Sequence, residues 1–272
     1  MRKSILKKVF TTVVVGVIGF GLVSCGNAAK EDKLTEIKNK GELVVGLSAD
    51  YAPYEFHIME NGEDKIVGFD VDIAEEIAKD MGVKLVIKDM EFDSLVAALP
   101  ANKVDLVISG MSPTDERRKA VDFSDVYYIA EHGMIVRAED KDKYKTFADL
   151  KGQKVGAQMG SIQADLAAEK IEGANMQLLS NVNDLVVSLK SGKIEALVVE
   201  LPVAEMIVKN NDILAIAEEK VKDEEGGSAI AIKKDSTELV SQVNLTVKRI
   251  KEEKLLDKFI IDSTDLAGKV NQ

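Results

Sequence analysis

Residues 93–108 read DSLVAALPANKVDLVI and residues 183–198 read NDLVVSLKSGKIEALV, so the two stretches align without a gap. Each begins with apolar residues at helical spacing, passes through a short polar turn and ends in an apolar run typical of a buried strand. Any helix–turn–strand unit shares part of this pattern. The agreement along the whole length nevertheless predicts two similar lobes of one α/β fold.

The elements around the first copy predict a lobe with a mainly parallel sheet. A helix begins near Asp70 or Asp72, either of which could cap it, and ends at Gly82. The Asn61-Gly62 pair predicts a turn. Apolar and β-branched runs predict strands over 43–47, 65–69, 83–87 and 104–108, and helical spacing predicts a helix over 93–99.

The second copy lies inside a similar unit, with strands expected over 154–157 and 196–199 and a helix over 164–170. Apolar runs at 133–136 and 228–232 predict two crossover strands that act as the hinge. We therefore assign residues 34–132 and 229–272 to lobe 1, and residues 133–228 to lobe 2. A final helix over 239–259 is expected to pack back on lobe 1.

The N-terminus has the order of residues found in a secretory signal. Four basic residues lie within the first eight positions, an apolar run spans 9–23, and the only cysteine of the chain, Cys25, follows it. This pattern resembles a bacterial lipoprotein signal, with residues 1–24 cleaved and Cys25 acylated. Residues 25–33 are small or charged, which predicts a flexible tether. We expect the protein to be held on the outer face of the bacterial cytoplasmic membrane by this lipid.

Charge and composition exclude several classes of function. The formal net charge is −11, which argues against nucleic-acid binding. A single cysteine cannot form an internal disulfide, and neither His57 nor His132 stands in a metal-binding or nucleophile motif. We therefore expect no cofactor, no metal and no enzymatic activity.

A candidate carboxylate site follows the strand of the first copy. Residues 109–117 read SGMSPTDER, which brings hydroxyls, backbone amides and Arg117 within a few residues. Arginine offers a two-pronged donor that matches a carboxylate, and a helix opening at Ser112 or Thr114 would add amide donors. In open α/β sheets ligands bind beyond the carboxyl ends of strands, and the second copy ends there with Glu200. The two strand ends therefore predict a site in a cleft between the lobes.

Together with this segment, several motifs resemble the family 3 extracellular solute-binding proteins, the polar amino-acid receptors of bacterial ABC importers. The motifs extend over nearly the whole chain after Cys25 and are ADYAPYEF at 49–56, VGFDVD at 67–72, VDFSD at 121–125 and DLKG at 149–152. The resemblance implies a two-lobed periplasmic-binding-protein-like fold of type II. It also implies a monomer that closes around its ligand.

The family pattern implies a role for each matching residue. Arg117 would clamp the ligand α-carboxylate, helped by the amides of Ser112 and Ser161. The carbonyl of Gly110, the hydroxyl of Ser112 and Glu200 would accept from the α-ammonium. Glu200 stands where the family usually has aspartate, so the contact with the amine depends on how the extra methylene is accommodated.

The ligand side chain would lie between Tyr51 and Phe92, whose aromatic faces suit aliphatic stems, amides and cations. The rest of the predicted site comes from the residues that flank these contacts and from distal selectivity positions. They are Ser109, Met111 and Gly160, with Ser48, Glu55, Glu91, Gln158, Met159 and Gln163.

The resemblance implies a receptor that binds a free polar L-amino acid, with glutamine, arginine or lysine favoured, and delivers it to an ABC permease with its ATPase. Two alternatives stay open. One is a dehydratase-like enzyme of the same fold that acts on a small carboxylic acid. The other is an amino-acid-sensing or adhesin lipoprotein.

Overall fold

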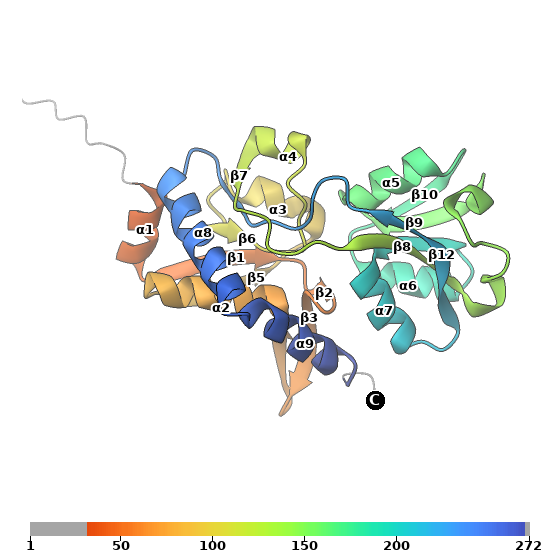
Figure 1. Cartoon of the computed structure of the whole chain (residues 1–272), viewed down its shortest axis with the longest axis horizontal. Coiled ribbons are helices and arrows are strands. Elements are labelled where there is room, and N and C mark those ends of the chain that lie inside the picture. Colours follow the sequence, from red (N-terminus) through yellow and green to blue (C-terminus); the bar gives the residue numbers. More distant parts are fainter. Residues whose placement is uncertain (1–31, 270–272) are drawn as a thin grey trace, which may run out of the picture. The chain divides into compact units, whose positions relative to one another are not determined.

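The computed structural model describes residues 32–269, which belong to one compact unit spanning Glu31–Gln272 (Figure 1). The predicted signal peptide, Cys25 and most of the predicted tether lie outside the described residues. Asp32 caps helix α1 (Lys33–Lys40) by accepting from the amide of Thr35 at 3.0 Å, so Lys33, placed in the tether above, is helical. None of the helices in this part of the chain has the length and apolar character needed to cross a membrane.

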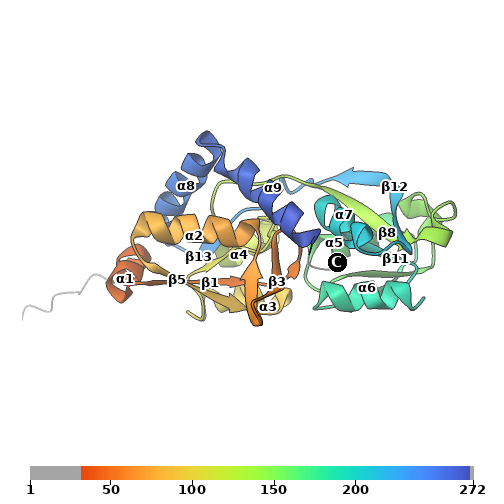
Figure 2. The ribbon, with the colours of Figure 1, turned by 90° about the horizontal axis from the view of Figure 1, so that it is seen from below.

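The first lobe is built on a five-stranded mixed sheet with the order β5-β1-β6-β13-β7 (Figures 1 and 2). β1 pairs in parallel with both β5 and β6, while β13 is antiparallel to its neighbours β6 and β7. The strands are β1 (Glu42–Leu47), β5 (Lys84–Asp89), β6 (Leu106–Val107), β7 (Val121–Phe123) and β13 (Ala231–Lys233). Its helices include α2 (Phe69–Met81), α3 (Phe92–Ala98) and α4 (Asp115–Ala120).

A small antiparallel sheet joins this lobe, formed by β2 (Asp50–Tyr51), β3 (Glu55–Glu60) and β4 (Glu63–Val67). The predicted turn at Asn61-Gly62 connects β3 to β4, with φ of 55° and 84° at its two residues. The strand expected over 65–69 therefore pairs with β3 and belongs to a different sheet from β1. It also ends earlier than expected, because α2 begins at Phe69.

The start of α2 differs from the expectation in one further respect. Neither Asp70 nor Asp72 is its N-cap, because Gly68 takes that position with a φ of 133°. The side chain of Asp70 instead accepts from two groups outside the helix, as described below. The predicted end of the helix at Gly82 is confirmed, with Gly82 in the left-handed conformation at φ 71°.

The second lobe repeats the arrangement with a sheet in the order β10-β9-β11-β8-β12. β11 is parallel to β9 on one side and antiparallel to β8 on the other. Its strands are β8 (Glu131–Arg137), β9 (Lys154–Gln158), β10 (Asn175–Leu179), β11 (Ala196–Glu200) and β12 (Leu214–Lys222). Its helices are α5 (Ile162–Lys170), α6 (Val182–Lys190) and α7 (Leu201–Lys209), with short 3-10 turns η1 (Ala138–Asp140) and η2 (Phe147–Leu150).

Two chain segments run between the sheets, one from β7 to β8 and one from β12 to β13 (Figure 1). They are hydrogen-bonded to each other, since the amide of Ser228 donates to the carbonyl of Tyr128 at 2.7 Å and the amide of Tyr127 donates to the carbonyl of Ser228 at 2.9 Å. A paired two-segment connection is the arrangement expected of a hinge.

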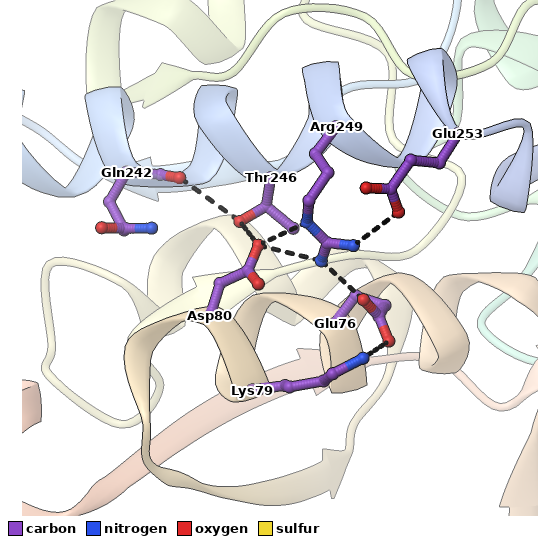
Figure 3. Close-up of polar contacts among 7 residues, drawn as sticks. All are labelled: Glu76, Lys79, Asp80, Gln242, Thr246, Arg249 and Glu253. Carbon is purple, nitrogen blue, oxygen red and sulfur yellow. Dashed lines mark hydrogen bonds and ion pairs between the residues drawn. The ribbon is translucent and has the colours of Figure 1, made fainter.

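The C-terminal part of the described chain packs against lobe 1, as expected, but as two helices (Figure 2). They are α8 (Thr237–Glu252) and α9 (Leu255–Ala267), separated at Lys254, whose φ is +58°. Arg249 of α8 reaches α2, where it pairs with Asp80 at 2.9 Å and with Glu76 (Figure 3). Thr246 also donates to Asp80 at 2.8 Å, so this cluster joins the two helices.

Candidate functional site

The segment after β6 contains the predicted carboxylate site. Thr114 is the N-cap of α4 and accepts from the amide of Arg117 at 3.2 Å, which confirms the helix opening expected there. The guanidinium of Arg117 donates to the carbonyl of Ser112 at 2.7 Å and, across the lobes, to the carbonyl of Gly160 at 2.8 Å. It also lies over the Phe92 ring at 5.4 Å from the centroid.

These contacts fix the position of the Arg117 guanidinium between the lobes. Burial lowers the pKa of its guanidinium to about 10, which leaves it charged at neutral pH. A carboxylate that reached Arg117 would meet a planar fork held by the Ser112 carbonyl and by stacking on Phe92. Among residues of lobe 1, this is the arrangement best suited to an anionic ligand group.

The strand end of lobe 2 places Glu200 against two tyrosines of lobe 1. The amide of Glu200 donates to the hydroxyl of Tyr51 at 3.1 Å, and the hydroxyl of Tyr54 donates to a carboxylate oxygen of Glu200. Glu200 is buried, and burial raises the pKa of its carboxyl to about 8. A cationic group beside it would reverse that shift, because an opposite charge favours the ionised carboxylate. Tyr54 belongs to the 49–56 motif, but the sequence analysis assigned it no role in the site.

Asp50 is a second residue that the sequence analysis missed. Its carboxylate accepts from the amide of Val182 in lobe 2 at 2.6 Å and from the hydroxyl of Ser48 at 3.1 Å. The side-chain amide of Gln158 donates to it at 3.4 Å. Two predicted selectivity residues, Ser48 and Gln158, therefore meet at this acid. Asp50 lies three residues beyond the carboxyl end of β1, where ligands of α/β sheets bind, and that position was a usable signal.

A pocket of about 360 Å³ lies beside Asp50 and is lined by both lobes. Its carboxylates come from lobe 1 and its amides from lobe 2. The lining includes Asp50, Asp89, Glu91, Ser48, His57, Asn181 and Asn183. The side chain of Asp50 is buried, and burial raises the pKa of its carboxyl to about 6. Asp89 pairs with His57 at 3.1 Å within this lining, and Asp50 and Glu91 add the acids that suit the pocket to a positively charged group.

The strand end of lobe 1 is itself held by buried acids. The hydroxyl of Ser109 donates to Glu55, and the amide of Gly110 donates to Asp70 at 2.8 Å. The hydroxyl of Tyr127, from the hinge segment, donates to the same oxygen of Asp70 at 2.9 Å. Glu55 was predicted as a selectivity residue, whereas Asp70 was assigned only to the start of a helix.

The remaining predicted residues divide between packing, capping and exposed positions. Met111 is fully buried in the same apolar cluster as Phe92. Ser161 caps α5 by accepting from the amide of Ala164 at 3.3 Å, and its own amide donates to the carbonyl of Gln158 at 3.2 Å. Gln163 is buried and lies 3.4 Å from a ring nitrogen of His132. Met159 is exposed.

The arrangement joins three kinds of group across the two lobes: a guanidinium fork, a buried acid among phenols and a pocket of carboxylates. Within residues 32–269, no group of three or more histidine, cysteine, aspartate or glutamate side chains is placed to hold a metal ion. The set matches the charges of a cationic amino acid, which carries one carboxylate and two positive groups.

Comparisons with known proteins point the same way. Residues 43–261 match the family described as bacterial extracellular solute-binding proteins, family 3. The chain is 41% identical over 256 residues to the arginine-binding extracellular protein ArtP of Bacillus subtilis, covering 93% of this chain and 96% of that protein. It is 32% identical over 256 residues to a probable histidine-binding protein of Campylobacter jejuni, covering 94% and 98%.

A crystal structure of the amino acid ABC transporter substrate-binding protein AbpA from Streptococcus pneumoniae, bound to L-arginine, has the same fold. The TM-score is 0.84 at 41% sequence identity, and the match covers 86% of this chain and 99% of that one. The two-lobed fold expected from the sequence is thereby confirmed.

Proposed function

The chain belongs to family 3 of the bacterial extracellular solute-binding proteins, and we propose that the amino acid it binds for an ABC importer is L-arginine. The observation that supports this choice is the set of acids beside the predicted side-chain position. Asp50, Asp89 and Glu91 line the pocket between the lobes. An arginine side chain presents five N–H donors in a planar fork, so it can pair with several carboxylates and amides at once, whereas a lysine ammonium offers three donors from a single atom.

In this proposal the ligand binds with its charges paired at both ends. Arg117 and the segment around Ser112 hold the α-carboxylate, while Glu200 accepts from the α-ammonium. The guanidinium extends toward Asp50 and the pocket that Asp89 and Glu91 line. Pairing of every charge is necessary, because an unpaired buried charge costs several kcal/mol.

Closure provides the signal for transport. Because the ligand would contact both lobes, it favours the form in which they meet, and the hinge at Tyr127–Tyr128 and Ser228 permits the movement. The closed form would then be recognised by a permease with its ATPase. The relatives named above are binding proteins, which supports a receptor over the dehydratase alternative.

The test is a calorimetric screen of the purified protein against the common L-amino acids, after unfolding and refolding to remove carried-over ligand. We expect a strong response to arginine, a weaker one to lysine and little response to glutamine. A preference for glutamine would contradict the assignment of the acids. Silence across the panel would overturn the proposal.

We also propose that the protein is anchored through a lipid on Cys25, on the outer face of the cytoplasmic membrane. The basis is the order of basic, apolar and small residues before that cysteine. The intact mass of the protein from the membrane fraction tests this. An acylated chain beginning at Cys25 is expected, and an unmodified secreted product would contradict it.

A further inference from the structure

His57 on β3 is the one basic side chain among the described residues that line the pocket beside Asp50. Both of its ring nitrogens face carboxylates. Nδ1 lies 2.9 Å and 3.0 Å from the two oxygens of Asp64 on β4, and Nε2 lies 3.1 Å from Oδ2 of Asp89 at the end of β5. Because β5 belongs to the main sheet of lobe 1, the ring connects that sheet to the small sheet of β3 and β4.

This geometry determines the charge of the His57 ring. A neutral imidazole has one N–H donor and one nitrogen that accepts, whereas an ionised carboxylate only accepts. Both ring nitrogens can therefore donate only when the ring is an imidazolium. Burial opposes this charge, but the hydrogen bonds with Asp64 and Asp89 outweigh burial and raise the pKa of His57 above its ordinary value of about 6.5.

The imidazolium is paired with an acid of the pocket. Oδ2 of Asp89 accepts from the ring, and Oδ1 of the same carboxylate accepts from the amide of Ala49 at 3.0 Å. Since both oxygens of Asp89 already accept from the protein, a ligand cation in this pocket would pair with Asp50 and Glu91. The same cation would lie near the positive charge of His57, and like charges disfavour each other.

Other ionisable groups around His57 affect how its titration can be observed. Inside the pocket, burial raises the pKa of Asp50 to about 6, so this acid also changes charge in the acidic range. On its other side the ring borders a hollow whose charged lining residues are Glu60, Asp64 and Lys269. Any pH dependence of binding would therefore combine contributions from Asp50 and His57, and variants of His57 are needed to separate them.

We propose that His57 is a specificity-determining residue of the pocket, and that the charge on its ring sets how strongly the protein prefers a cationic ligand side chain over a neutral one of the same shape. The inference rests on the function proposed above. With the ring charged, one cation offsets the acids of the pocket; with the ring neutral, nothing in the lining does. Arginine therefore binds more tightly once the ring has lost its proton, and bound arginine favours that loss.

Two substitutions at the same position isolate the charge. His57→Lys keeps a positive charge there at every pH of interest, whereas His57→Gln removes it. We expect the Lys variant to bind arginine about fivefold more weakly than the Gln variant, as for two like charges separated by several ångströms in a partly exposed site. Isothermal titration calorimetry between about pH 5.5 and pH 8.5 measures these affinities over the range in which histidine changes charge.

The wild type should change from one behaviour to the other. At the acidic end its affinity for arginine should match that of His57→Lys, and at the basic end it should approach that of His57→Gln. The titration of Asp50 acts on all three proteins alike, so it does not alter their order. Lys65→Gln is the matched control, because it removes a positive charge from the same hairpin outside the pocket and should keep the wild-type pH profile.

Equal affinities of the Lys and Gln variants for arginine would overturn the inference and leave the proposed function intact. A wild type that matches His57→Gln at the acidic end would also overturn it, because the ring would then be neutral there. Absence of arginine binding by the wild type would instead overturn the proposed function, and the inference with it. The failures are therefore distinguishable.

Proton NMR titration measures the charge of the ring directly. The chain has two histidines, so His57→Gln identifies which ring signals belong to His57. In the ligand-free protein we expect the pKa of His57 to exceed about 6.5, and arginine should lower it. Citrulline, which has the shape of arginine without its charge, should leave it nearly unchanged. A ligand-free pKa below this value, or one that saturating arginine does not lower, would overturn the inference.

Discussion

The two repeated units, residues 93–108 and 183–198, have the same framework but different chemistry at their ends. In each lobe a helix precedes the central strand of the sheet, and that strand is parallel to one neighbour and antiparallel to the other. In lobe 1 the repeated unit is followed by neutral Ser109 and Gly110, which are hydrogen-bonded to buried acids. In lobe 2 the repeated unit is followed by an acid, Glu200, which is hydrogen-bonded to two tyrosines of lobe 1.

Each repeated unit also packs against one glycine of the neighbouring parallel strand. A Cβ on Gly46 of β1 would lie 3.1 Å from Val104 and 3.3 Å from Leu95, whereas a Cβ on Gly156 of β9 would lie 2.5 Å from Ile194 and 3.0 Å from Leu185. The two pairs of contacts occupy matching positions in the repeat. Apolar packing is therefore preserved between the lobes, while the polar contacts are specific to each lobe.

The largest effect is expected from removing the guanidinium of Arg117 in lobe 1. Arg117→Ala should weaken arginine binding at least 100-fold, about 3 kcal/mol, because the α-carboxylate would lose its charged donor. Isothermal titration calorimetry measures this. Arg118→Ala is the matched control, since Arg118 stacks on Phe123 instead, and it should bind normally. Near-normal affinity of Arg117→Ala would show that the strand end of lobe 1 does not hold the carboxylate.

The next effect concerns the acid that joins the lobes. Asp50→Asn should weaken arginine binding by about tenfold or more, as expected for losing a charged hydrogen-bond partner of the cation. Asp64→Asn is the control, because Asp64 contacts His57 but does not line the pocket between the lobes. Equal affinities of the two variants for arginine would show that Asp50 does not bind the cationic side chain of the ligand.

The two glycines sharpen the comparison of packing. Gly156→Ala should lower the free energy of unfolding by about 2 kcal/mol and Gly46→Ala by about 1 kcal/mol, because inserting a methyl group into a packed core forces its neighbours to move. Urea denaturation of both variants measures the difference. The reverse order would mean that the lobe 2 helix can shift more easily than its packing indicates.

The last effect is a dependence of stability on pH that comes from Glu200 in lobe 2. The pKa of Glu200 is about 8 in the folded protein and ordinary when unfolded, so the folded state binds more protons between these values. Stability from this group therefore falls as pH rises from about 4.5 to 8. Relative to the wild type, Glu200→Gln should become progressively more stable as pH rises from about 4.5 to 8, and the two proteins should be equally stable near pH 4. A wild-type advantage at pH 8 would contradict the buried, protonated acid.

The framework could be predicted from the sequence because it depends on apolar periodicity, which is local. The repeat, the helix opening at Thr114 and the end of α2 at Gly82 were all visible in this way. The division between α8 and α9 was not, because the left-handed residue there is Lys254, and no glycine or proline marks the break.

The polar partners of the site were harder to predict. Glu200 ends β11 and Arg117 belongs to the polar segment that follows β6, so their positions suggested them. Asp50 and Asp70 act through groups that are distant in sequence, such as Val182 and Tyr127. Local patterns carry no information about such contacts, which is why Asp70 was first assigned to a helix cap.

The most direct test of the account is a crystal structure of the protein with L-arginine. We expect the α-carboxylate on Arg117, the α-ammonium beside Glu200 and the guanidinium in the pocket lined by Asp50, Asp89 and Glu91. An arginine bound elsewhere, or bound with its guanidinium toward Arg117 and its carboxylate toward Asp50, would contradict it.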